Sequence, residues 1–343
     1  MKKKLALLLA VVLIFTFAFT ACGGSDTPAG DDGGDATVEA AKIVWANYGS
    51  SKMPIAKADL EAIKYMEESG LFEVDYQPDG VLGGEADMIQ QVMDGTIQAT
   101  ILSSSTFSSF SPLLDCIQLP FLIGDYETER KALESPEAQA LYDGIEEELG
   151  IKIIGYAENG IRHFATKTKA INTLADLKGL KLRIVPSNML TEVMTNLGAA
   201  PTSVAYAEVY SALQNNVIDG EEINITSIYA MSHYEQLKYI SEIGMYPFPS
   251  FVCVNAEFWN SLSEEQQKVW LEAEKISEDF EFATALPEFE KEAREACENA
   301  GIEFNTIEGA DRDEFVEIAK KTWETYRAQD ERIAAFIEAV SAM

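Results

Sequence analysis

Two arginines within apolar, strand-like segments constrain this chain more than any other feature of its sequence. The segments read I-R-H-F-A around Arg162 and K-L-R-I-V around Arg183, so each guanidinium is expected among β-branched and aromatic neighbours. An unpaired charge is costly there, and a guanidinium binds a carboxylate through two parallel hydrogen bonds. Each arginine therefore needs an anionic partner, which is either a protein carboxylate in a structural ion pair or a bound ligand.

The order of predicted elements before residue 103 indicates a parallel α/β sheet. Strand patterns alternate with amphipathic helical patterns, and Pro54, Gly70 and Gly95 bound the helical ones. Strands that alternate with helices are typical of β-α-β units with parallel strands. The expected elements are a strand over 42–48, a helix over 55–68, a strand over 71–77, a helix over 85–94 and a strand over 96–102.

Polar residues follow the first and third of these strands. Ligands of open α/β sheets bind beyond the carboxyl ends of the strands, so hydroxyl and amide groups there are candidates to bind a solute. The alternative is a solvated loop in which a serine caps a helix. The candidates are Asn47, Tyr48 and Ser50 after the first strand and Ser103, Ser104 and Ser105 after the third.

A second group of elements indicates a second lobe. The chain is expected to cross into it near Glu158, after a helix over 127–149 and a strand over 151–156. Segments 237–243 and 251–255 are expected to return the chain to the first lobe, which leaves a cleft between two lobes rich in parallel strands. The expected elements of the second lobe are strands over 161–166, 181–185 and 217–225 and helices over 188–196 and 206–215.

The C-terminal part is expected to be helical. Ser263-Glu264-Glu265-Gln266 matches a capping box, and apolar residues follow at helical spacing. Pro287 is expected to kink or interrupt this helix before a segment over 289–300. The amphipathic tail over 311–340 is expected to pack as helices on the second lobe. The expected division is 1–21 signal peptide, 22–40 linker, 41–158 plus 249–288 lobe I, and 159–248 plus 289–343 lobe II.

The N-terminal segment has the pattern of a signal peptide. A basic start is followed by an apolar run and by Phe19-Thr20-Ala21-Cys22, which resembles a bacterial lipobox with Phe at the position usually held by Leu. Lipidation of Cys22 would anchor the protein to a membrane. The alternatives are a secreted protein cleaved after Ala21 and a retained transmembrane segment, for which the apolar run is short. The Gly- and Asp-rich segment 23–37 is typical of a flexible tether.

Charge and cysteine content exclude several classes of function. The net charge of −31 argues against binding of nucleic acid and against attachment to a membrane through a basic patch. Beyond Cys22 the chain has Cys116, Cys253 and Cys297, with no C-x-x-C motif and no metal-like spacing, so at most one disulfide can form. Buried free thiols are the favoured interpretation at this chain length.

Several co-linear motifs carry a family resemblance. They are N-G-x-R at 159–162, D-L-K-G-L-K-L-R at 176–183, L-G-A-x-P-T at 197–202, E-V-Y-x-A-L-Q-x-x-x-I-D-G-x-E at 208–222, P-D-G-V-L-G-G-E at 78–85, L-P-F at 119–121 and F-W-N-S-L-S-E-E-Q-Q at 258–267. Together they resemble the DctP-type solute-binding proteins of TRAP transporters. The resemblance implies an α/β, two-lobed periplasmic-binding-protein-like fold with a ligand cleft between the lobes and a long helix spanning both.

The resemblance also implies a function and partners. The ligand would be a small organic acid, such as a sugar acid, a dicarboxylate or another monocarboxylate. An extracytoplasmic, lipid-anchored receptor would deliver it to the small and large membrane TRAP permease subunits, without a cofactor or metal.

The same resemblance assigns roles to residues. Arg183 would be the main carboxylate clamp and Arg162 a second contact to the same end of the ligand. Glu222 is expected to orient an arginine or tyrosine, and Tyr246 to wall the cleft or to belong to the core. The family usually has Asn where this chain has Ile223, and Asn224 cannot simply replace it because strand side chains alternate between faces. The candidate ligand-binding set is Arg183, Arg162, Asn47, Ser103, Ser105, Asn224, Glu222 and Tyr246.

Enzymatic motifs are missing from the sequence. The chain has only His163 and His233, and no H-E-x-x-H, G-x-x-x-x-G-K-[ST], G-x-S-x-G or dinucleotide-binding glycine pattern. Paired carboxylates are uninformative in so acidic a chain, which leaves a cell-surface hydrolase of acidic sugars as the alternative from another class. The alternative within the class is a receptor for an uncharged or aromatic solute.

Overall fold

The computed structural model describes residues 39–343. The expected signal peptide, the lipobox with Cys22 and nearly all of the expected linker lie outside the described residues. Within 39–343 no helix is both long and apolar enough to cross a membrane. Cys116, Cys253 and Cys297 are buried free thiols, as the favoured interpretation of the sequence predicted.

The first lobe is built on a mixed five-stranded sheet in the order β2-β1-β3-β10-β4. Strand β1 is parallel to both β2 and β3, and β10 is antiparallel to both β3 and β4. The β-α-β interpretation of the sequence is therefore confirmed, with a returning strand inserted between β3 and β4. The strands are β1 (Ala41–Asn47), β2 (Phe72–Gln77), β3 (Ala99–Ser103), β4 (Ile151–Glu158) and β10 (Pro249–Asn255).

Helices α1 (Pro54–Glu68) and α2 (Glu85–Met93) connect the parallel strands. Proline at the first position of α1 has no N–H to satisfy, and Ala58, Ala62 and Met66 of α1 are fully buried. The serine-rich segment after β3, for which a solvated loop was one of the two interpretations, forms the short helix α3 (Ser104–Phe107).

The second lobe is built on a six-stranded sheet in the order β11-β9-β5-β8-β6-β7. β5 is antiparallel to β8 and β9, and the other neighbours are parallel. The prediction that 237–243 returns to the first lobe is wrong, because β9 pairs with β5 and β11 in this sheet. The strands are β5 (His163–Thr166), β6 (Lys181–Ile184), β7 (Ala200–Ser203), β8 (Gly220–Ile223), β9 (Tyr239–Glu242) and β11 (Glu303–Thr306).

Short helices complete this lobe. The predicted helix over 188–196 is confirmed as α6 (Asn188–Asn196), which Ser187 caps by accepting from Leu190 N. The predicted helix over 206–215 is a 3₁₀ turn η3 (Tyr206–Glu208) that continues as α7 (Val209–Gln214). The remaining short elements here are η2 (Leu174–Leu177), α8 (Ile225–Ala230) and η4 (His233–Glu235).

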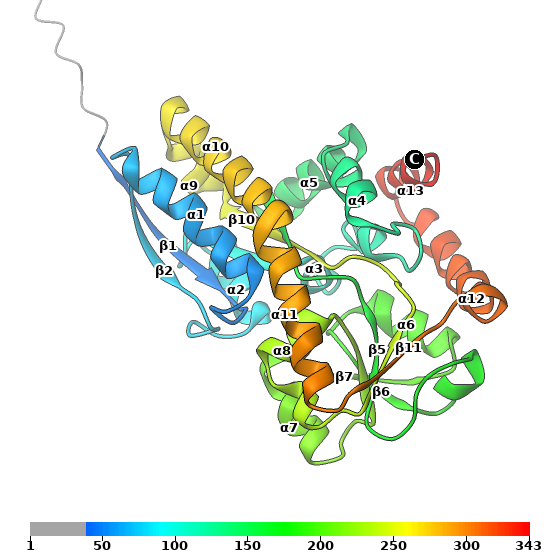
Figure 1. The fold of residues 1–343 in the computed structure, drawn as a ribbon. Helices are drawn as coiled ribbons and strands as arrows, with labels where there is room; N and C mark the ends of the chain where they lie inside the picture. The colour runs from blue at the N-terminus through cyan, green and yellow to red at the C-terminus, as the bar shows by residue number, and fades with distance from the viewer. Residues whose placement is uncertain (1–38) are drawn as a thin grey trace, which may run out of the picture. The chain divides into compact units, whose positions relative to one another are not determined.

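Three connections between the lobes are central to the site. Two are extended, from β4 to β5 and from β9 to β10, and the third is the long helix that runs past both lobes (Figure 1). It consists of α10 (Glu264–Phe280), which packs on α1, a π-helical turn η5 (Glu281–Ala285), and α11 (Leu286–Asn299), which packs on α8. Ser263 and Gln266 form the predicted capping box at its start, and the interruption lies just before Pro287.

The remaining helices correct two expectations. The single helix expected over 127–149 is two helices, α4 (Tyr126–Leu133) and α5 (Pro136–Leu149), because Ser135 caps a new helix that begins with Pro136. The tail forms α12 (Gly309–Arg327) and α13 (Glu331–Ser341). α12 contacts α6 as expected, whereas α13 packs on α5 and α4 of the first lobe.

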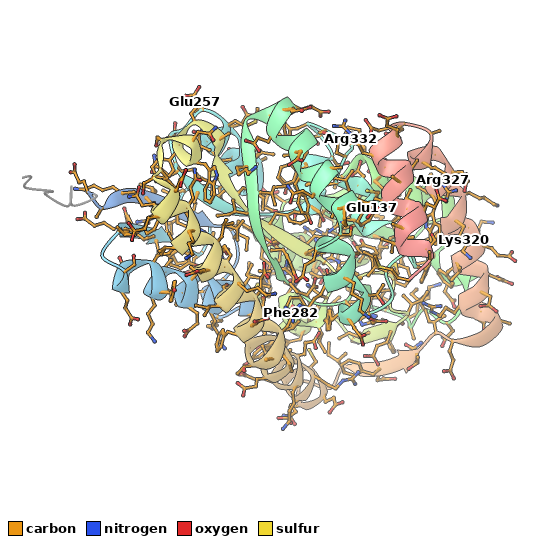
Figure 2. All side chains as sticks on the ribbon, turned by 90° about the horizontal axis from the view of Figure 1, so that it is seen from above. Glu137, Glu257, Phe282, Lys320, Arg327 and Arg332 are labelled. Atoms are coloured by element: carbon orange, nitrogen blue, oxygen red, sulfur yellow. The ribbon has the colours of Figure 1, made fainter. Side chains whose placement is uncertain are left out.

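The contact of α13 with α5 has a local cause. Ile333, Phe336 and Ile337 of α13 are fully buried. Arg332, labelled in Figure 2, lies at the start of α13, and its Nη2 is 3.6 Å from Glu148 Oε1 of α5. The short elements η1 (Asp115–Gln118) and α9 (Ala256–Ser261) complete the described fold.

Candidate ligand site between the lobes

A small cavity lies between the lobes, at the two extended connections. Its volume is about 20 Å³, close to the space that one water molecule occupies. Pockets for small organic ligands measure roughly 300 Å³ or more, so the lobes must separate to admit such a ligand. The cavity is lined by Tyr48, Glu85, Asn159, Arg162, Arg183, Val185, Tyr206, Ser227 and Phe248.

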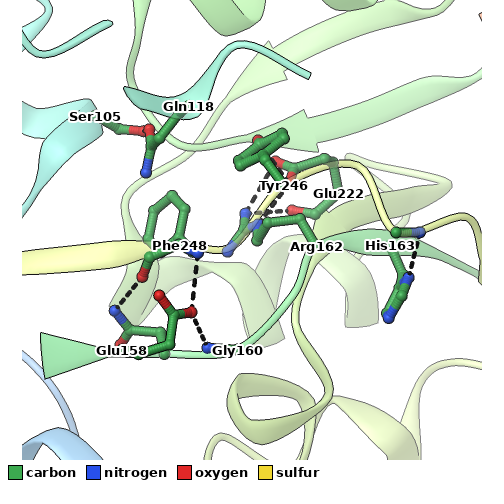
Figure 3. A network of polar contacts seen from close by, with 11 residues as sticks. Ser105, Gln118, Glu158, Gly160, Arg162, His163, Glu222, Tyr246 and Phe248 are labelled. Atoms are coloured by element: carbon green, nitrogen blue, oxygen red, sulfur yellow. Dashed lines mark hydrogen bonds and ion pairs between the residues drawn. The ribbon is translucent and has the colours of Figure 1, made fainter. Parts of the chain in front are cut away.

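Arg162 is a paired arginine. It stands on the connection between β4 and β5, where its N–H donates to Tyr246 O at 2.9 Å. Its Nε donates to one carboxylate oxygen of Glu222, and its Nη2 donates to the other at 2.9 Å (Figure 3). The Phe248 ring lies 4.2 Å from the guanidinium carbon, in a cation–π contact. Although burial lowers the pKa of Arg162, the Glu222 carboxylate raises it above its ordinary value.

Glu222 therefore orients an arginine and a tyrosine together, as the sequence analysis expected. Besides Arg162, it accepts a hydrogen bond of 2.9 Å from the hydroxyl of Tyr246. Tyr246 is fully buried and does not line the cavity, whereas its neighbour Phe248 does. Arg162, Glu222 and Tyr246 thus form a buried network in which each polar group supports the next.

Arg183 is an unpaired arginine. It lies on β6 with 1% of its surface exposed, and its Nε donates to Val204 O at 3.0 Å. Its Nη1 is buried without a hydrogen-bond partner, and no carboxylate among residues 39–343 forms an ion pair with it. Burial lowers the pKa of Arg183, and the nearby positive charge of Arg162 lowers it further. A buried cation of this kind requires an anion that the described protein does not supply.

The cavity walls come from both lobes. Tyr48 of the first lobe and Tyr206 of the second meet edge to face, with ring centroids 6.1 Å apart. The Tyr48 hydroxyl lies 2.9 Å from Ser250 Oγ and donates to Asn159 Oδ1 at 3.3 Å. The aromatic contact of Tyr48 with Tyr206 therefore joins the two lobes across the cavity.

Glu85 adds a carboxylate to the opposite wall. Its Oε1 accepts hydrogen bonds from Ser103 N, Ser103 Oγ and Thr106 Oγ1. Its other oxygen, Oε2, makes no hydrogen bond within the described residues and is available to a hydroxyl or amine. The cavity therefore has an unpaired cation in the second lobe and a carboxylate in the first.

Of the eight predicted ligand-binding residues, only Arg162 and Arg183 line this cavity; Glu222, Tyr246, Asn224, Asn47, Ser103 and Ser105 do not. Ser103 donates its hydroxyl to Glu85 at 2.6 Å, and Ser105 donates to Gln118. The Asn47 amide bonds Asp59 Oδ2 at 2.6 Å and accepts from Gly49 N at 2.7 Å, so its groups are used within the first lobe. Of these residues, Ser103 acts on the cavity indirectly, by orienting Glu85.

Ile223 stands where the resemblance implies an asparagine, and its side chain does not face the cavity. Ile223 packs in an apolar cluster with Val209 and Leu213, away from the cavity. Asn224 is fully buried, and neither its amide oxygen nor its amide nitrogen has a partner. It lies against Gly160, where a Cβ would approach the Cβ of Asn224 to 3.2 Å and where φ is +119°. Glycine at 160 therefore allows the connection to pass close to Asn224.

Sequence reasoning missed Glu85, Asn159, Val185, Tyr206 and Ser227 as lining residues. Glu85 and Asn159 are the last and first residues of two family motifs, so the motifs themselves could have identified them. Nothing in the local patterns around Tyr206 and Ser227 distinguishes them from other surface positions.

A larger cavity of about 200 Å³ lies beside α11, and its charges do not suit an anion. It is lined by Tyr126, Ile161, His163, Ile225, Ile240, Glu242, Glu290 and Arg294. Arg294 is already paired with Glu242 and Glu298. Burial lowers the pKa of His163 to about 4, so this histidine is neutral near pH 7. In the part of the chain that the structure describes, no group of three or more His, Cys, Asp or Glu residues could hold a metal ion.

Comparisons with known proteins agree with this geometry. The family model for DctP, bacterial extracellular solute-binding protein, family 7, matches residues 46–330. The 2,3-diketo-L-gulonate-binding periplasmic protein YiaO of Escherichia coli is 29% identical over 229 residues, which cover 67% of this chain and 69% of that protein.

Solved structures show the same fold. A TRAP periplasmic solute-binding protein of Roseobacter denitrificans with bound β-D-glucuronate matches with a TM-score of 0.84 and 26% identity, covering 88% of this chain and 100% of that one. One from Bradyrhizobium in complex with D-galacturonate matches with a TM-score of 0.83 and 28% identity, at 88% and 100% coverage. The chain thus belongs to the DctP family of bacterial extracellular solute-binding proteins.

Proposed function

We propose that this protein is the receptor of a TRAP transporter and captures a small organic acid, whose carboxylate binds Arg183 in the cavity between the lobes. The observation that carries the proposal is the buried, unpaired guanidinium of Arg183. A carboxylate matches its planar donors and supplies the charge that the surrounding protein lacks. Arg162 lines the same cavity and contributes a second, weaker contact, because Glu222 already occupies two of its donors.

The ligand class that fits both walls is a hydroxylated monocarboxylate, such as a uronic or aldonic acid. Its carboxylate would lie at Arg183, and a hydroxyl group at the other end would donate to Glu85. A dicarboxylate would bring its second negative charge towards Glu85, which is unfavourable at short range. Relatives with bound glucuronate and galacturonate support this choice.

The ligand would be enclosed by closure of the lobes, with the connections near 158 and 248 as boundaries between lobe I and lobe II. Arg162 and Arg183 are at most 2% exposed, so exchange of a ligand requires opening. Closure around the ligand would be the state that the small and large permease subunits recognise. Family membership supports this partner and an extracytoplasmic location.

A thermal-shift screen of organic acids tests the ligand class. D-galacturonate, D-glucuronate and L-gulonate are expected to raise the melting temperature, because a ligand that binds only the folded state stabilises it by mass action. D-galactose, which lacks the carboxylate of galacturonate, is the matched control and should give no shift. Succinate tests the role of Glu85. A shift with galactose and none with any acid would contradict the proposal.

Mass analysis of the recovered ligand separates the receptor from the alternative of a hydrolase. A receptor returns the acid unchanged after incubation, whereas a hydrolase converts a glycoside of that acid into smaller products. Family membership favours the receptor.

Attachment of the protein to the membrane through Cys22 is a further part of this proposal. Cys22→Ser should release the protein from the membrane fraction or leave it uncleaved. Cys116→Ser, at a buried thiol, is the control and should leave membrane attachment unchanged. Normal processing and unchanged attachment of the Cys22→Ser protein would exclude lipidation.

A further inference from the structure

Three glutamates are fully buried where the lobes join. Glu129 lies on α4, Glu158 at the end of β4 and Glu281 at the start of the π-helical turn η5, and each is 0% exposed. No lysine, arginine or histidine forms an ion pair with any of them within residues 39–343. Ionised carboxylates are costly in such surroundings without a cation or several donors.

Glu158 connects all three links between the lobes. Its Oε1 accepts from Gly160 N at 2.5 Å, on the link from β4 to β5, and from Phe248 N at 2.9 Å, on the link from β9 to β10 (Figure 3). Its own backbone N–H donates to Glu281 Oε2 at 2.9 Å, on the long helix. A change in the charge or position of Glu158 therefore acts on the whole hinge.

Glu129 points into this group without a protein donor. Neither of its carboxyl oxygens has a hydrogen-bond partner, and neither does Oε2 of Glu158. The Glu129 and Glu158 carboxyls are neighbours, because the charge of Glu158 raises the pKa of Glu129. Two ionised carboxylates repel each other, whereas a proton on one of them would supply the donor that the buried oxygens lack.

The other titratable groups around the cluster are carboxyls and one tyrosine, and none of them carries a positive charge. They come from every element packed against it: Asp59 of α1, Asp125 and Tyr126 at the start of α4, Glu278 of α10 and Glu290 of α11. None of these groups can neutralise an ionised pair. Because no cation of the described residues pairs with the cluster, a proton can neutralise the pair.

We propose that Glu129 and Glu158 form a proton-binding site at the hinge, and that the proton they share holds the lobes in the closed arrangement. Loss of the proton places two negative charges next to each other at the connections between the lobes, and their repulsion favours opening of the lobes. Opening brings water to the carboxyls, and closing takes a proton from solvent. The inference rests on the proposed function only in that closure is taken to accompany ligand binding.

Solvent has a route to this site. Tyr126 lines the 200 Å³ cavity, where its hydroxyl donates to Glu290 and accepts from Ile161 N at 3.2 Å. The charges of Glu158 and Glu129 also act on Tyr126. The cavity thus reaches Tyr126 and Glu290 at the edge of the cluster, which places a route for proton exchange next to it.

The direction of the pH effect follows from burial. Desolvation raises the pKa of Glu158 to about 7, and desolvation together with the charge of Glu158 raises the pKa of Glu129 well above its usual range. A raised pKa in the closed state means that stabilisation is present at low pH and is lost as pH rises. Ligand affinity should accordingly fall from about pH 5 upwards, by up to roughly tenfold per pH unit for each proton taken up.

Glu129→Gln is the central test. Glutamine keeps the shape of the side chain and offers a permanent N–H donor to Glu158, so closure no longer needs a proton. Small-angle X-ray scattering of the ligand-free full chain at about pH 6 and about pH 9 should show the wild type opening at the higher pH and the variant staying compact. Glu129→Met is a second variant, whose side chain is neutral at every pH. It keeps the test decisive if Glu129→Gln does not fold.

Calorimetry of D-glucuronate binding in buffers of different ionisation enthalpy gives the second measurement. The wild type should take up protons on binding near pH 7, and both Glu129 variants should take up fewer. Asp59, Asp115 and Glu278 also have pKa values raised to about 7 by burial, so the decisive quantity is the difference between wild type and variant.

The control is Glu127→Gln on the same helix, because the Glu127 side chain is 82% exposed. The Glu127→Gln variant should keep the wild-type pH dependence in scattering and the wild-type proton uptake in calorimetry. Glu129 variants that keep that dependence in scattering and in calorimetry would overturn the inference. Absence of glucuronate binding in the wild type would count against the proposed ligand class, and scattering would still decide the role of the hinge.

Discussion

The cleft and the hinge bury charges of opposite sign, although the single connection 158–162 contributes to both. In the cleft, Arg162 has the carboxylate of Glu222 as a partner and Arg183 has none. In the hinge, Glu129, Glu158 and Glu281 have backbone donors at most. A buried charge without a protein partner needs one from outside, so the sign of the excess charge indicates what each region binds.

The difference between the regions also separates their responses. The excess cation in the cleft cannot lose its charge near neutral pH, because a guanidinium keeps its proton, and it therefore favours an anionic ligand. The carboxyls of the hinge can take up a proton instead. Closure of one molecule would then depend on an acid in the cleft and on protons at the hinge.

The largest expected effect comes from breaking the pair that is complete. Glu222→Gln leaves the Arg162 guanidinium buried without its carboxylate and should lower the free energy of unfolding by about 3–5 kcal/mol. Urea denaturation measures it. Arg183→Met is the matched comparison and should leave stability unchanged or higher, because it removes a buried charge that has no partner. Equal losses in the two variants would remove the distinction between the arginines.

Arg183→Lys should abolish most ligand binding without unfolding the protein. Lysine keeps the charge but cannot make two parallel bonds to one carboxylate. Affinity for the best acid of the screen should fall about tenfold to a thousandfold, corresponding to roughly 1.5–4 kcal/mol. Titration calorimetry measures it. Wild-type affinity together with a lowered melting temperature would identify Arg183 as a structural residue.

The smallest expected effect concerns the carboxylate in the opposite wall. Glu85→Gln should weaken binding of a sugar acid by up to about tenfold, because a charge-assisted bond to a ligand hydroxyl becomes a neutral one. Binding of succinate should become stronger in the same variant, since the repulsion disappears. Parallel changes for the two ligands would show that Glu85 does not select between them.

Local patterns predicted much of the fold. The capping box at Ser263, the interruption before Pro287 and the bounds of α6 depend on residues close in sequence, and they agree with the structure. The location of β9 and α13 was predicted incorrectly. The local sequence of a short apolar strand or of an amphipathic helix does not specify which sheet the strand joins or which helix the helix packs against.

The motifs selected three residues that the structure places near one another. Arg162 and Arg183 line the cavity, and Glu222 pairs with Arg162. Their roles in ligand binding stay predictions. The motifs did not show that Asn47 would bond Asp59, and Ser105 would bond Gln118, within the first lobe. Hydrogen-bonding capacity is visible in a sequence, but its use depends on groups that lie far away along the chain.

By itself, the sequence determined the family, the class of fold and the need for anions at two arginines. Only the tertiary structure decided that Glu222, sixty positions from Arg162, satisfies one of them and leaves the other unpaired. It also decided that Glu129, Glu158 and Glu281, from three separate elements, meet at the hinge. The physical reason is that helix and strand preferences act between neighbouring residues, whereas burial and charge pairing depend on which distant segments fold against each other.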